Sequence, residues 1–245
     1  MFPIRDENPT QYKPVATIVL IGLNVAAWVL LQGLGTEPAL TRSVCTFGLV
    51  PADVLDVAVT GQRLCPPGYS DGWLGVLTSM FMHGGWMHII GNMWFLWVFG
   101  DNVEDAMGRA RFVIFYVLCG IGAALAQMVS SPGSAIPMVG ASGAIGGVMG
   151  AYAVLYPRAH VILLVFLGFF VTTVAVPAIF MLGYWFLLQL LSGAMAPSHV
   201  GGVAFWAHVG GFVAGMVLVF PFRRPERVDW RRRQGPSHNA RHRWF

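Results

Sequence analysis

Charged residues are scarce in this chain. Asp, Glu, Lys and Arg together make up 11% of its 245 residues, whereas apolar residues make up 56%, and the mean hydropathy is +0.64. Soluble globular domains carry about 25% charged residues, so this composition excludes an ordinary soluble domain. The chain is therefore predicted to be a helical membrane protein with several spans.

Four long runs contain no Asp, Glu, Lys or Arg: residues 15–34, 73–100, 112–157 and 159–222. A helix crosses the hydrocarbon core of a bilayer with about 20 apolar residues, so these runs hold several spans. The first run is too long for the core of a signal peptide, and further spans follow it. We therefore expect it to remain part of the folded protein.

The predicted fold is an all-α bundle of six transmembrane helices, with spans at residues 15–34, 74–99, 112–129, 140–156, 176–191 and 205–222. The last charge-free run is long enough for three spans. Three would place the Arg-rich C-terminal segment on the side opposite the other basic segments, so we predict two. Residues 161–174 are then expected to form a surface or partly re-entrant connection.

The basic residues predict the orientation in the membrane. Thirteen of the fifteen Lys and Arg residues lie in segments 1–14, 101–111, 158–159 and 223–245, which share one side if the six spans alternate. Loops rich in Lys and Arg stay in the cytoplasm. Residues 1–14 are thus predicted to be a cytoplasmic lead, residues 101–111 a cytoplasmic turn, and residues 223–245 a basic cytoplasmic tail.

A nucleic acid bound to the Arg-rich tail is the alternative explanation of its charge, but the orientation rule already accounts for it. The predicted partners are the lipid bilayer and other membrane proteins, without nucleic acid. The sequence makes no prediction of an oligomeric state.

Cysteine is scarce as well, with three residues in the chain. Cys119 lies in the predicted third span, whereas Cys45 and Cys65 both fall in the long segment 35–72 outside the spans. In an oxidising compartment these two can form a disulfide that closes a loop of roughly 20 residues and contributes on the order of 3 kcal/mol. Two unpaired thiols are the alternative, and the sequence leaves both open. Residues 50–59 of this segment are expected to form a short amphipathic helix at the membrane interface.

Metal-binding motifs are absent from the sequence. It contains no His-Glu-x-x-His pattern, and the five-residue spacing of His83 and His88 does not place them on one helical face. A metal protease of this type is therefore disfavoured, and no metal and no cofactor is predicted.

Polar residues at membrane depth are costly and mark functional sites. The predicted second span carries three of them: His83, His88 and Asn92. His88 and Asn92 are four residues apart and project from the same helical face, which favours a shared role. His83 is not aligned with this pair, and we expect it to be structural, bonding neighbouring helices.

Two predicted spans carry small or polar residues on one face, spaced by three or four residues: Ser142, Gly146 and Gly150 in the fourth span, and His208, Gly211 and Gly215 in the sixth. Such faces let two helices approach at backbone distance. The Ser and the His lie at the same end of their spans, so this packing predicts a hydroxyl within reach of an imidazole, which is the minimum for an activated serine. For a lone membrane Ser, simple helix packing is the alternative.

Taken together, Ser142, His208, His88 and Asn92 supply the roles that acyl transfer requires: a nucleophile, a base and donors for the oxyanion. The predicted spans contain no carboxylate that could orient the His. The expected arrangement is therefore a dyad without the third member of a triad.

With these motifs, the chain resembles the rhomboid family of intramembrane serine proteases, in particular the bacterial six-span type. The matching stretches are Met-His-Gly-Gly-Trp-Met-His-Ile-Ile-Gly-Asn at 82–92, Gly-Ala-Ser-Gly at 140–143 and Ala-His-Val-Gly-Gly at 207–211. They lie on three separate predicted spans. The resemblance extends over residues 15–222, with six spans in the order of the family.

This resemblance implies Ser142 as nucleophile and His208 as general base and then acid. It implies His88 and Asn92 as oxyanion donors beside the backbone N–H of Ser142, whereas His83 matches a further family His whose role is structural. The implied substrates are transmembrane segments of other proteins, cleaved through an acyl-enzyme. The implied location is a bacterial inner membrane, with the active site open to the periplasmic or extracellular side.

Two positions depart from the pattern of the family. Trp73-Leu74 stands where a Trp-Arg pair is often found, which removes an anchor of the first outward loop. Gly146 stands where an aromatic residue often follows the nucleophile by four positions, which removes a ring that would pack under His208. Neither departure removes a chemical role.

Two functions of other classes compete with the protease. The first is a catalytically silent membrane-protein binder or chaperone on the same bundle, for which the Ser142→Ala variant would retain function. The second is a transporter or channel whose buried His residues relay protons or ions, for which reconstituted protein would show flux. The sequence shows no inverted repeat of the kind that many transporters contain.

Overall fold

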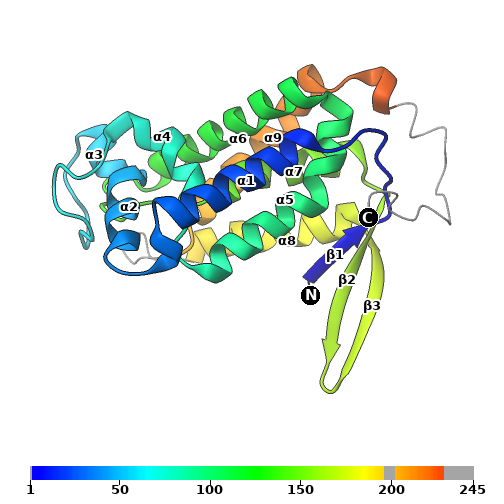
Figure 1. Ribbon diagram of the computed structural model, residues 1–245, viewed down its shortest axis with the longest axis horizontal. Helices are drawn as coiled ribbons and strands as arrows, with labels where there is room; N and C mark the ends of the chain where they lie inside the picture. Colours follow the sequence, from blue (N-terminus) through cyan, green and yellow to red (C-terminus); the bar gives the residue numbers. More distant parts are fainter. Residues whose placement is uncertain (1, 196–201, 229–245) are drawn as a thin grey trace.

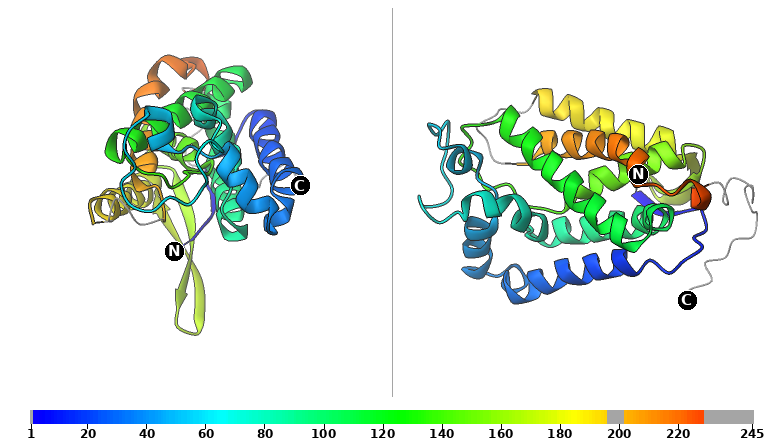
Figure 2. Two further views of the ribbon diagram at one scale, coloured as in Figure 1. Left: turned by 90° about the vertical axis from the view of Figure 1, so that its left-hand side faces the viewer. Right: turned by 90° about the horizontal axis from the view of Figure 1, so that it is seen from above.

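The computed structural model describes residues 2–195 and 202–228 (Figure 1). Within these residues, six helices of 14 to 22 residues form a bundle: α1 (Val15–Leu30), α5 (Trp86–Met107), α6 (Arg109–Ser130), α7 (Ser142–Leu155), α8 (Ala178–Met195) and α9 (Phe205–Phe222). The fold is mostly helical, as predicted. In Figure 2, α8 and α1 lie at opposite edges of the bundle, and α9 lies next to α8.

Most predicted spans coincide with helices. Helix α9 has the predicted bounds, and the bounds of α1, α6, α7 and α8 differ from prediction by at most four residues at either end. Within the described residues, α6, α8 and α9 are long and apolar enough to cross a membrane, and α1 and α7 are shorter apolar helices. Apolar helices of this length are typical of an integral membrane protein.

The predicted start of the second span is wrong. Residues 72–81 form three short helical turns, η2 (Gly72–Leu74), α4 (Gly75–Thr78) and η3 (Ser79–Phe81), and α5 begins only at Trp86. The chain is extended at Gly85, which caps α5. His83 therefore lies in the connection before α5 and outside the helix.

The predicted cytoplasmic turn at 101–111 is also different in the structure. Helix α5 continues through Glu104 and Asp105 to Met107, and α6 begins two residues later. The Glu104 carboxylate accepts hydrogen bonds from the backbone N–H groups of Ala16 and Thr17, at 3.0 and 2.8 Å. These N–H groups have no partner within α1 because they lie in its first turn. Glu104 therefore caps the start of α1 from within α5.

A three-stranded antiparallel sheet was not predicted, so the all-α description is incomplete. Its strands, in order, are β1 (Phe2–Asp6), β2 (His160–Leu167) and β3 (Phe170–Pro177). Strands β2 and β3 form a hairpin around Gly168, whose φ of +63° suits glycine. The hairpin projects from the bundle (Figure 1) and occupies the residues that were expected to form a surface or re-entrant connection.

The sheet is joined to the bundle at the end away from Ser142. The Asp6 carboxylate accepts hydrogen bonds from the Tyr152 hydroxyl and from Asn102 Nδ2. The first turn of α8 is held by backbone bonds, from the Ala178 N–H to the Ala159 carbonyl at 2.8 Å and from the Ile179 N–H to the Pro157 carbonyl at 3.1 Å. Helix α8 is thus fixed at its base to the end of α7.

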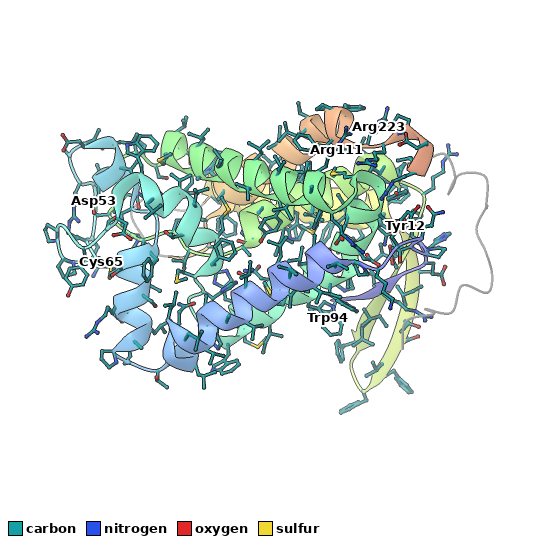
Figure 3. All side chains as sticks on the ribbon, turned by 45° about the horizontal axis from the view of Figure 1, so that its top comes forward. Tyr12, Asp53, Cys65, Trp94, Arg111 and Arg223 are labelled. Carbon is teal, nitrogen blue, oxygen red and sulfur yellow. A yellow bond between two sulfur atoms is a disulfide. The ribbon has the colours of Figure 1, made fainter. Side chains whose placement is uncertain are left out.

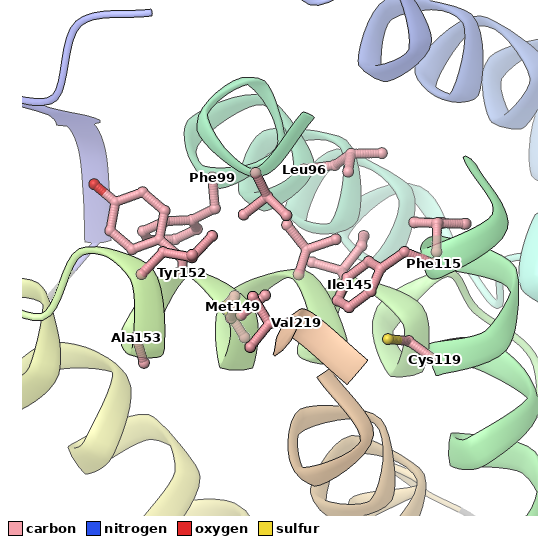
Figure 4. Packing of buried hydrophobic residues seen from close by; sticks show 14 of the residues in the cluster. Leu96, Phe99, Phe115, Cys119, Ile145, Met149, Tyr152, Ala153 and Val219 are labelled. Atoms are coloured by element: carbon pink, nitrogen blue, oxygen red, sulfur yellow. The ribbon is translucent and has the colours of Figure 1, made fainter. Parts of the chain in front are cut away.

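The hydrophobic core lies where α5, α6, α7 and α9 meet (Figure 4). Large side chains that are fully or almost fully buried fill it: Leu96 and Phe99 of α5, Phe115 and Cys119 of α6, and Ile145, Met149 and Tyr152 of α7. Cys119 is buried and unbonded. In a bilayer the hydrophobic effect does not favour contact between helices over contact with lipid, so these side chains hold the helices together through close van der Waals packing.

The long segment between α1 and α5 is folded. It contains η1 (Gly33–Gly35), α2 (Ala39–Phe47) and α3 (Pro51–Leu55), so the helix expected at 50–59 is shorter than predicted. The structure joins Cys45 to Cys65 as a disulfide and pairs Arg63 with Asp53 at 2.8 Å (Figure 3). Trp73 and Leu74, where an anchoring Arg is missing, are exposed. The disulfide and the ion pair tie this segment instead.

Helices α7 and α9 pack at backbone distance, as their small residues predicted. Methyl groups added at Gly211 and Gly215 of α9 would overlap the carbonyl oxygens of Gly143 and Gly147 of α7. We call this contact of four residues the glycine seam. Only glycine permits so close an approach, and the seam fixes the distance between the two helices.

Candidate active site

Ser142 and His208 face each other across the glycine seam. Ser142 is the first residue of α7, and His208 lies in the first turn of α9, at the same end of the bundle. The distance from Ser142 Oγ to His208 Nε2 is 2.7 Å. The structure thus brings together the hydroxyl and the imidazole that the sequence placed at equivalent depths.

The other ring nitrogen of His208 also has a partner. His208 Nδ1 lies 2.8 Å from Oε1 of Gln189, a residue of α8. An amide oxygen only accepts hydrogen bonds, so Nδ1 carries the proton and Nε2 presents a lone pair to the Ser142 hydroxyl. This is the tautomer in which an imidazole can accept a proton from serine.

An aromatic ring of α8, the helix that also carries Gln189, packs against His208. The centroids of the Trp185 and His208 rings are 5.8 Å apart, and the rings are tilted by 35°. A methyl group at Gly146 would lie 3.7 Å from Cη2 of Trp185. Gly146 leaves no ring of α7 under His208, and Trp185 of α8 supplies one, beside the space that a larger residue at 146 would need.

Neither Gln189 nor Trp185 was predicted from the sequence to belong to the site. A signal for Gln189 was present, since an amide in the middle of the run Leu187-Leu188-Gln189-Leu190-Leu191 is a polar group at membrane depth. No comparable signal existed for Trp185, because an aromatic residue in an apolar helix is common.

His88 lies in the first turn of α5 and faces the serine. Its Nδ1 accepts a hydrogen bond from the backbone N–H of Gly84 at 3.3 Å, so the ring proton is on Nε2. A methyl group at Gly140 would lie 2.6 Å from this Nε2 and 3.4 Å from Ser142 Oγ. His88 Nε2 and the Ser142 hydroxyl therefore both lie next to Gly140.

Asn92 lies one turn further along α5, on the same face as His88. Its side chain is 8% exposed, and its Nδ2 has no hydrogen-bond partner among the described residues. An unpaired buried donor is uncommon because it costs about 1–3 kcal/mol. Asn92 therefore offers a donor to a ligand oxygen that enters the site.

His83 is buried behind His88. The two rings meet edge to face with centroids 5.1 Å apart, and neither nitrogen of His83 has a hydrogen-bond partner in the part of the chain that the structure describes. Instead, its backbone is held by the Gln32 side chain, whose Nε2 donates to the His83 carbonyl at 2.7 Å and whose Oε1 accepts from the His83 N–H at 2.8 Å. Gln32, which sequence analysis passed over, thus fixes the connection before α5.

A small cavity of about 20 Å³ lies beside Ser142. Its walls include Gly140 and Gly143 from the start of α7, Gly120 and Ala123 from α6, and Ala207 from α9. A cavity of this size has room for about one water molecule. No group of three or more His, Cys, Asp or Glu that could hold a metal occurs in residues 2–195 and 202–228.

Known proteins show sequence similarity to this chain. A family model described as the rhomboid domain matches residues 70–225. The rhomboid protease GluP of Bacillus subtilis is 31% identical over 211 residues, which cover 85% of this chain and 36% of that protein. Rhomboid protein 1 of Saccharomyces cerevisiae mitochondria is 26% identical over 233 residues, which cover 92% of this chain and 57% of that protein.

A third relative is rhomboid-like protein 11 of Arabidopsis thaliana chloroplasts, which is 27% identical over 158 residues, 60% of this chain and 52% of that protein. The chain therefore spans between about a third and somewhat more than half of the length of these three relatives.

Proposed function

Because the chain belongs to the rhomboid family, we propose that it is an intramembrane serine endopeptidase that cleaves other membrane proteins in or near their transmembrane segments. The observation that carries this proposal is the 2.7 Å contact between Ser142 Oγ and His208 Nε2. The name of the Bacillus relative, a rhomboid protease, supports the same class of activity.

In the proposed reaction, Ser142 Oγ attacks the carbonyl carbon of the scissile peptide while His208 Nε2 takes the hydroxyl proton. The tetrahedral intermediate collapses as the same nitrogen gives that proton to the leaving amine, and an ester to Ser142 remains. Water then attacks the ester, again losing a proton to His208, and the freed acid and serine complete the cycle. The small cavity beside Ser142 gives such a water a place near the ester.

The oxyanion of the tetrahedral intermediate would be bound by three N–H donors. His88 directs Nε2–H toward the region beside Ser142, and Asn92 has an unpaired Nδ2 on the same face. The backbone N–H of Ser142 lies at the start of α7, where helix N–H groups have no intrahelical partner. Such donors are typically worth about 3 kcal/mol each in the transition state. His83 would support this set through its contact with His88.

We further propose that the six long helices each cross the membrane, with both termini in the cytoplasm. One pocket at the end of the bundle away from Ser142 is lined by four cationic residues, Lys13, Arg109, Arg224 and Arg227, and by two acidic ones, Glu104 and Asp105. Cationic groups gathered at this end favour its cytoplasmic placement. Ser142 would then open toward the periplasmic or extracellular side of a bacterial inner membrane. Most of the predicted tail, 229–245, lies outside the described residues.

A substrate helix would enter from the side, past α8. Backbone carbonyls in a membrane helix are hydrogen-bonded within the helix, so the substrate must unwind locally before Ser142 can reach one. Small or helix-breaking residues near the outer end of a substrate would favour this unwinding.

The test uses the full chain in detergent and in liposomes. Wild-type protein should react with a fluorophosphonate probe and cleave a model transmembrane substrate, whereas Ser142→Ala and His208→Ala should lose both activities, by on the order of 10⁴-fold or more. Ser130→Ala, the same exchange in an exposed Ser at the end of α6, is the matched control.

Labelling that persists in both Ser142→Ala and His208→Ala would exclude the dyad. A silent binder or chaperone predicts no cleavage by the wild type and a cellular function that survives the Ser142→Ala exchange.

A further inference from the structure

We propose that Gln189 is a positioning residue of the Ser142–His208 pair, which holds the His208 ring in the tautomer that can accept the serine proton. The inference rests on the proposed protease function and deepens it. It assigns to an amide on α8 the orienting task that a carboxylate performs in serine triads.

The first argument is the geometry of the imidazole. A neutral ring carries one proton, on Nδ1 or on Nε2. With Nδ1 at 2.8 Å from Gln189 Oε1 and Nε2 at 2.7 Å from Ser142 Oγ, both nitrogens are engaged. If the proton were on Nε2, Nδ1 and Oε1 would be two acceptors facing each other, and Nε2 could not act as the base. With its Oε1 toward the ring, as observed, Gln189 therefore favours the productive tautomer; the other tautomer would require the amide to turn its NH2 group toward Nδ1.

The helices around His208 contain no carboxylate that could orient its ring. The sequence contains no Asp or Glu between residues 106 and 225, so α6, α7, α8 and α9 carry no carboxylate. A third member of the usual kind cannot come from these helices. The amide of Gln189 is neutral and thus orients the ring at a lower desolvation cost than a buried carboxylate.

The third argument is the place of Gln189 in α8. Four leucines flank it, and a polar amide is costly in such a run unless it is hydrogen-bonded. Trp185 lies one turn earlier on the same face and packs against the same ring. Two side chains of one helix thus fix the plane and the tautomer of His208.

The test compares Gln189→Leu with Gln189→Glu in the full chain, using the cleavage of a model transmembrane substrate in liposomes. Leucine removes the acceptor, so kcat should fall about 10-fold to 100-fold while KM stays within about twofold, because the ring is misplaced and substrate contacts are not. Glutamate keeps an acceptor oxygen at the same reach and should restore kcat to within about fivefold of wild type.

Gln127→Leu on α6 is the matched control, since it makes the same exchange away from the dyad. The Gln127 side chain is partly buried, and its Oε1 has no hydrogen-bond partner among the described residues. We expect this variant to keep the wild-type kcat.

A spectroscopic measurement addresses the tautomer itself. In protein labelled with ¹⁵N-histidine, His208 should show a protonated Nδ1 and an unprotonated Nε2, and Gln189→Leu should shift the population toward protonated Nε2. Thermal unfolding in detergent shows whether the variant is folded. If Gln189→Leu is not, Gln189→Met, which also lacks the amide oxygen, replaces it.

The outcomes separate the two proposals. Full activity of Ser142→Ala would overturn the protease function. If Ser142→Ala is inactive but Gln189→Leu matches Gln127→Leu in kcat and keeps the wild-type tautomer, the role of Gln189 is wrong and the protease function stands. Equal loss in Gln189→Leu and Gln189→Glu with an unchanged tautomer would also overturn the role of Gln189.

Discussion

His208 is held from two sides that are built differently. Toward α7, the contact is the glycine seam, in which backbone meets backbone without intervening side chains. Toward α8, the contact consists of the Trp185 ring and the Gln189 amide, and α8 otherwise lies at the edge of the bundle (Figure 2) with Phe180, Leu187 and Leu191 at least half exposed.

The contacts toward α7 and those toward α8 determine two different properties of the site, a distance and a ring orientation. A backbone contact has no rotamers, so it sets a distance that cannot be adjusted without moving a whole helix. The glycine seam thus fixes how far Ser142 is from His208. Side-chain contacts set the direction of the ring, and they change when a rotamer or the position of α8 changes.

The largest effect is expected when a glycine of the glycine seam is replaced by a larger residue. Gly211→Ala places a methyl group on the carbonyl oxygen of Gly143, so α7 and α9 must separate, and we expect a loss of about 3 kcal/mol or more in unfolding free energy. Gly183→Ala is the matched control on α8, where a methyl group meets nothing within 4 Å. That exchange should be neutral or stabilising by up to about 1 kcal/mol.

Thermal or denaturant-induced unfolding in detergent measures the difference in unfolding free energy between the two variants. Equal stability of Gly211→Ala and Gly183→Ala would contradict the contrast between the two sides of His208.

An intermediate effect is expected at Gly140, on the α7 side. Its φ of +128° is a region that side chains rarely adopt, and a methyl group would lie 2.6 Å from His88 Nε2. Gly140→Ala should therefore displace the His88 donor and lower kcat by about 100-fold, as for other lost oxyanion donors. Gly85→Ala, where a methyl group meets nothing, serves as the control, and steady-state cleavage is the measurement. A Gly140→Ala enzyme as active as Gly85→Ala would remove His88 from the site.

The smallest effect is expected on the α8 side, at Trp185. Trp185→Ala removes a ring contact worth about 0.5–1.5 kcal/mol, so kcat should fall only by about threefold to tenfold. Trp185→Phe should lose less, because it keeps a ring. Tyr184→Ala, at a neighbouring residue that is 62% exposed, is expected to have no effect on kcat. A loss at Trp185 as large as that at Gly140 would show that both sides of His208 are equally rigid.

The sequence predicted those parts of the fold that depend on local pattern. Helix α9 has its predicted bounds, and α7 and α9 approach each other at backbone distance as their small residues predicted. The contact includes the predicted Gly146 and Gly150, but its closest points on α7, Gly143 and Gly147, were not predicted. The predicted start of α5 was wrong because residues 73–100 form one run without charged residues, which contains no signal for where the helix begins. Hydropathy does not detect the extended backbone at Gly85, where the chain turns into the helix.

Contacts between distant segments explain the other differences. The β-branched residues and phenylalanines of β2 and β3 are typical of strands, but β1 joins them from more than 150 residues away. Gln189 and His208 likewise belong to different helices, and no motif links them. The residues at 88, 92, 142 and 208 were found because each lies in a recognisable motif, and their catalytic roles stay predictions.

Because α8 is attached at its base, a change in its tilt moves its far end the most. Ala178 and Ile179 are hydrogen-bonded to the segment that follows α7, and Gln189 lies about 16 Å of helical rise beyond this attachment. A tilt of about 10° would carry the Gln189 amide sideways by about 3 Å, more than its hydrogen bond to His208 tolerates. The same tilt would leave the distance between Ser142 and His208 unchanged. The position of one peripheral helix can therefore determine whether the His208 ring is held in the tautomer that accepts the serine proton.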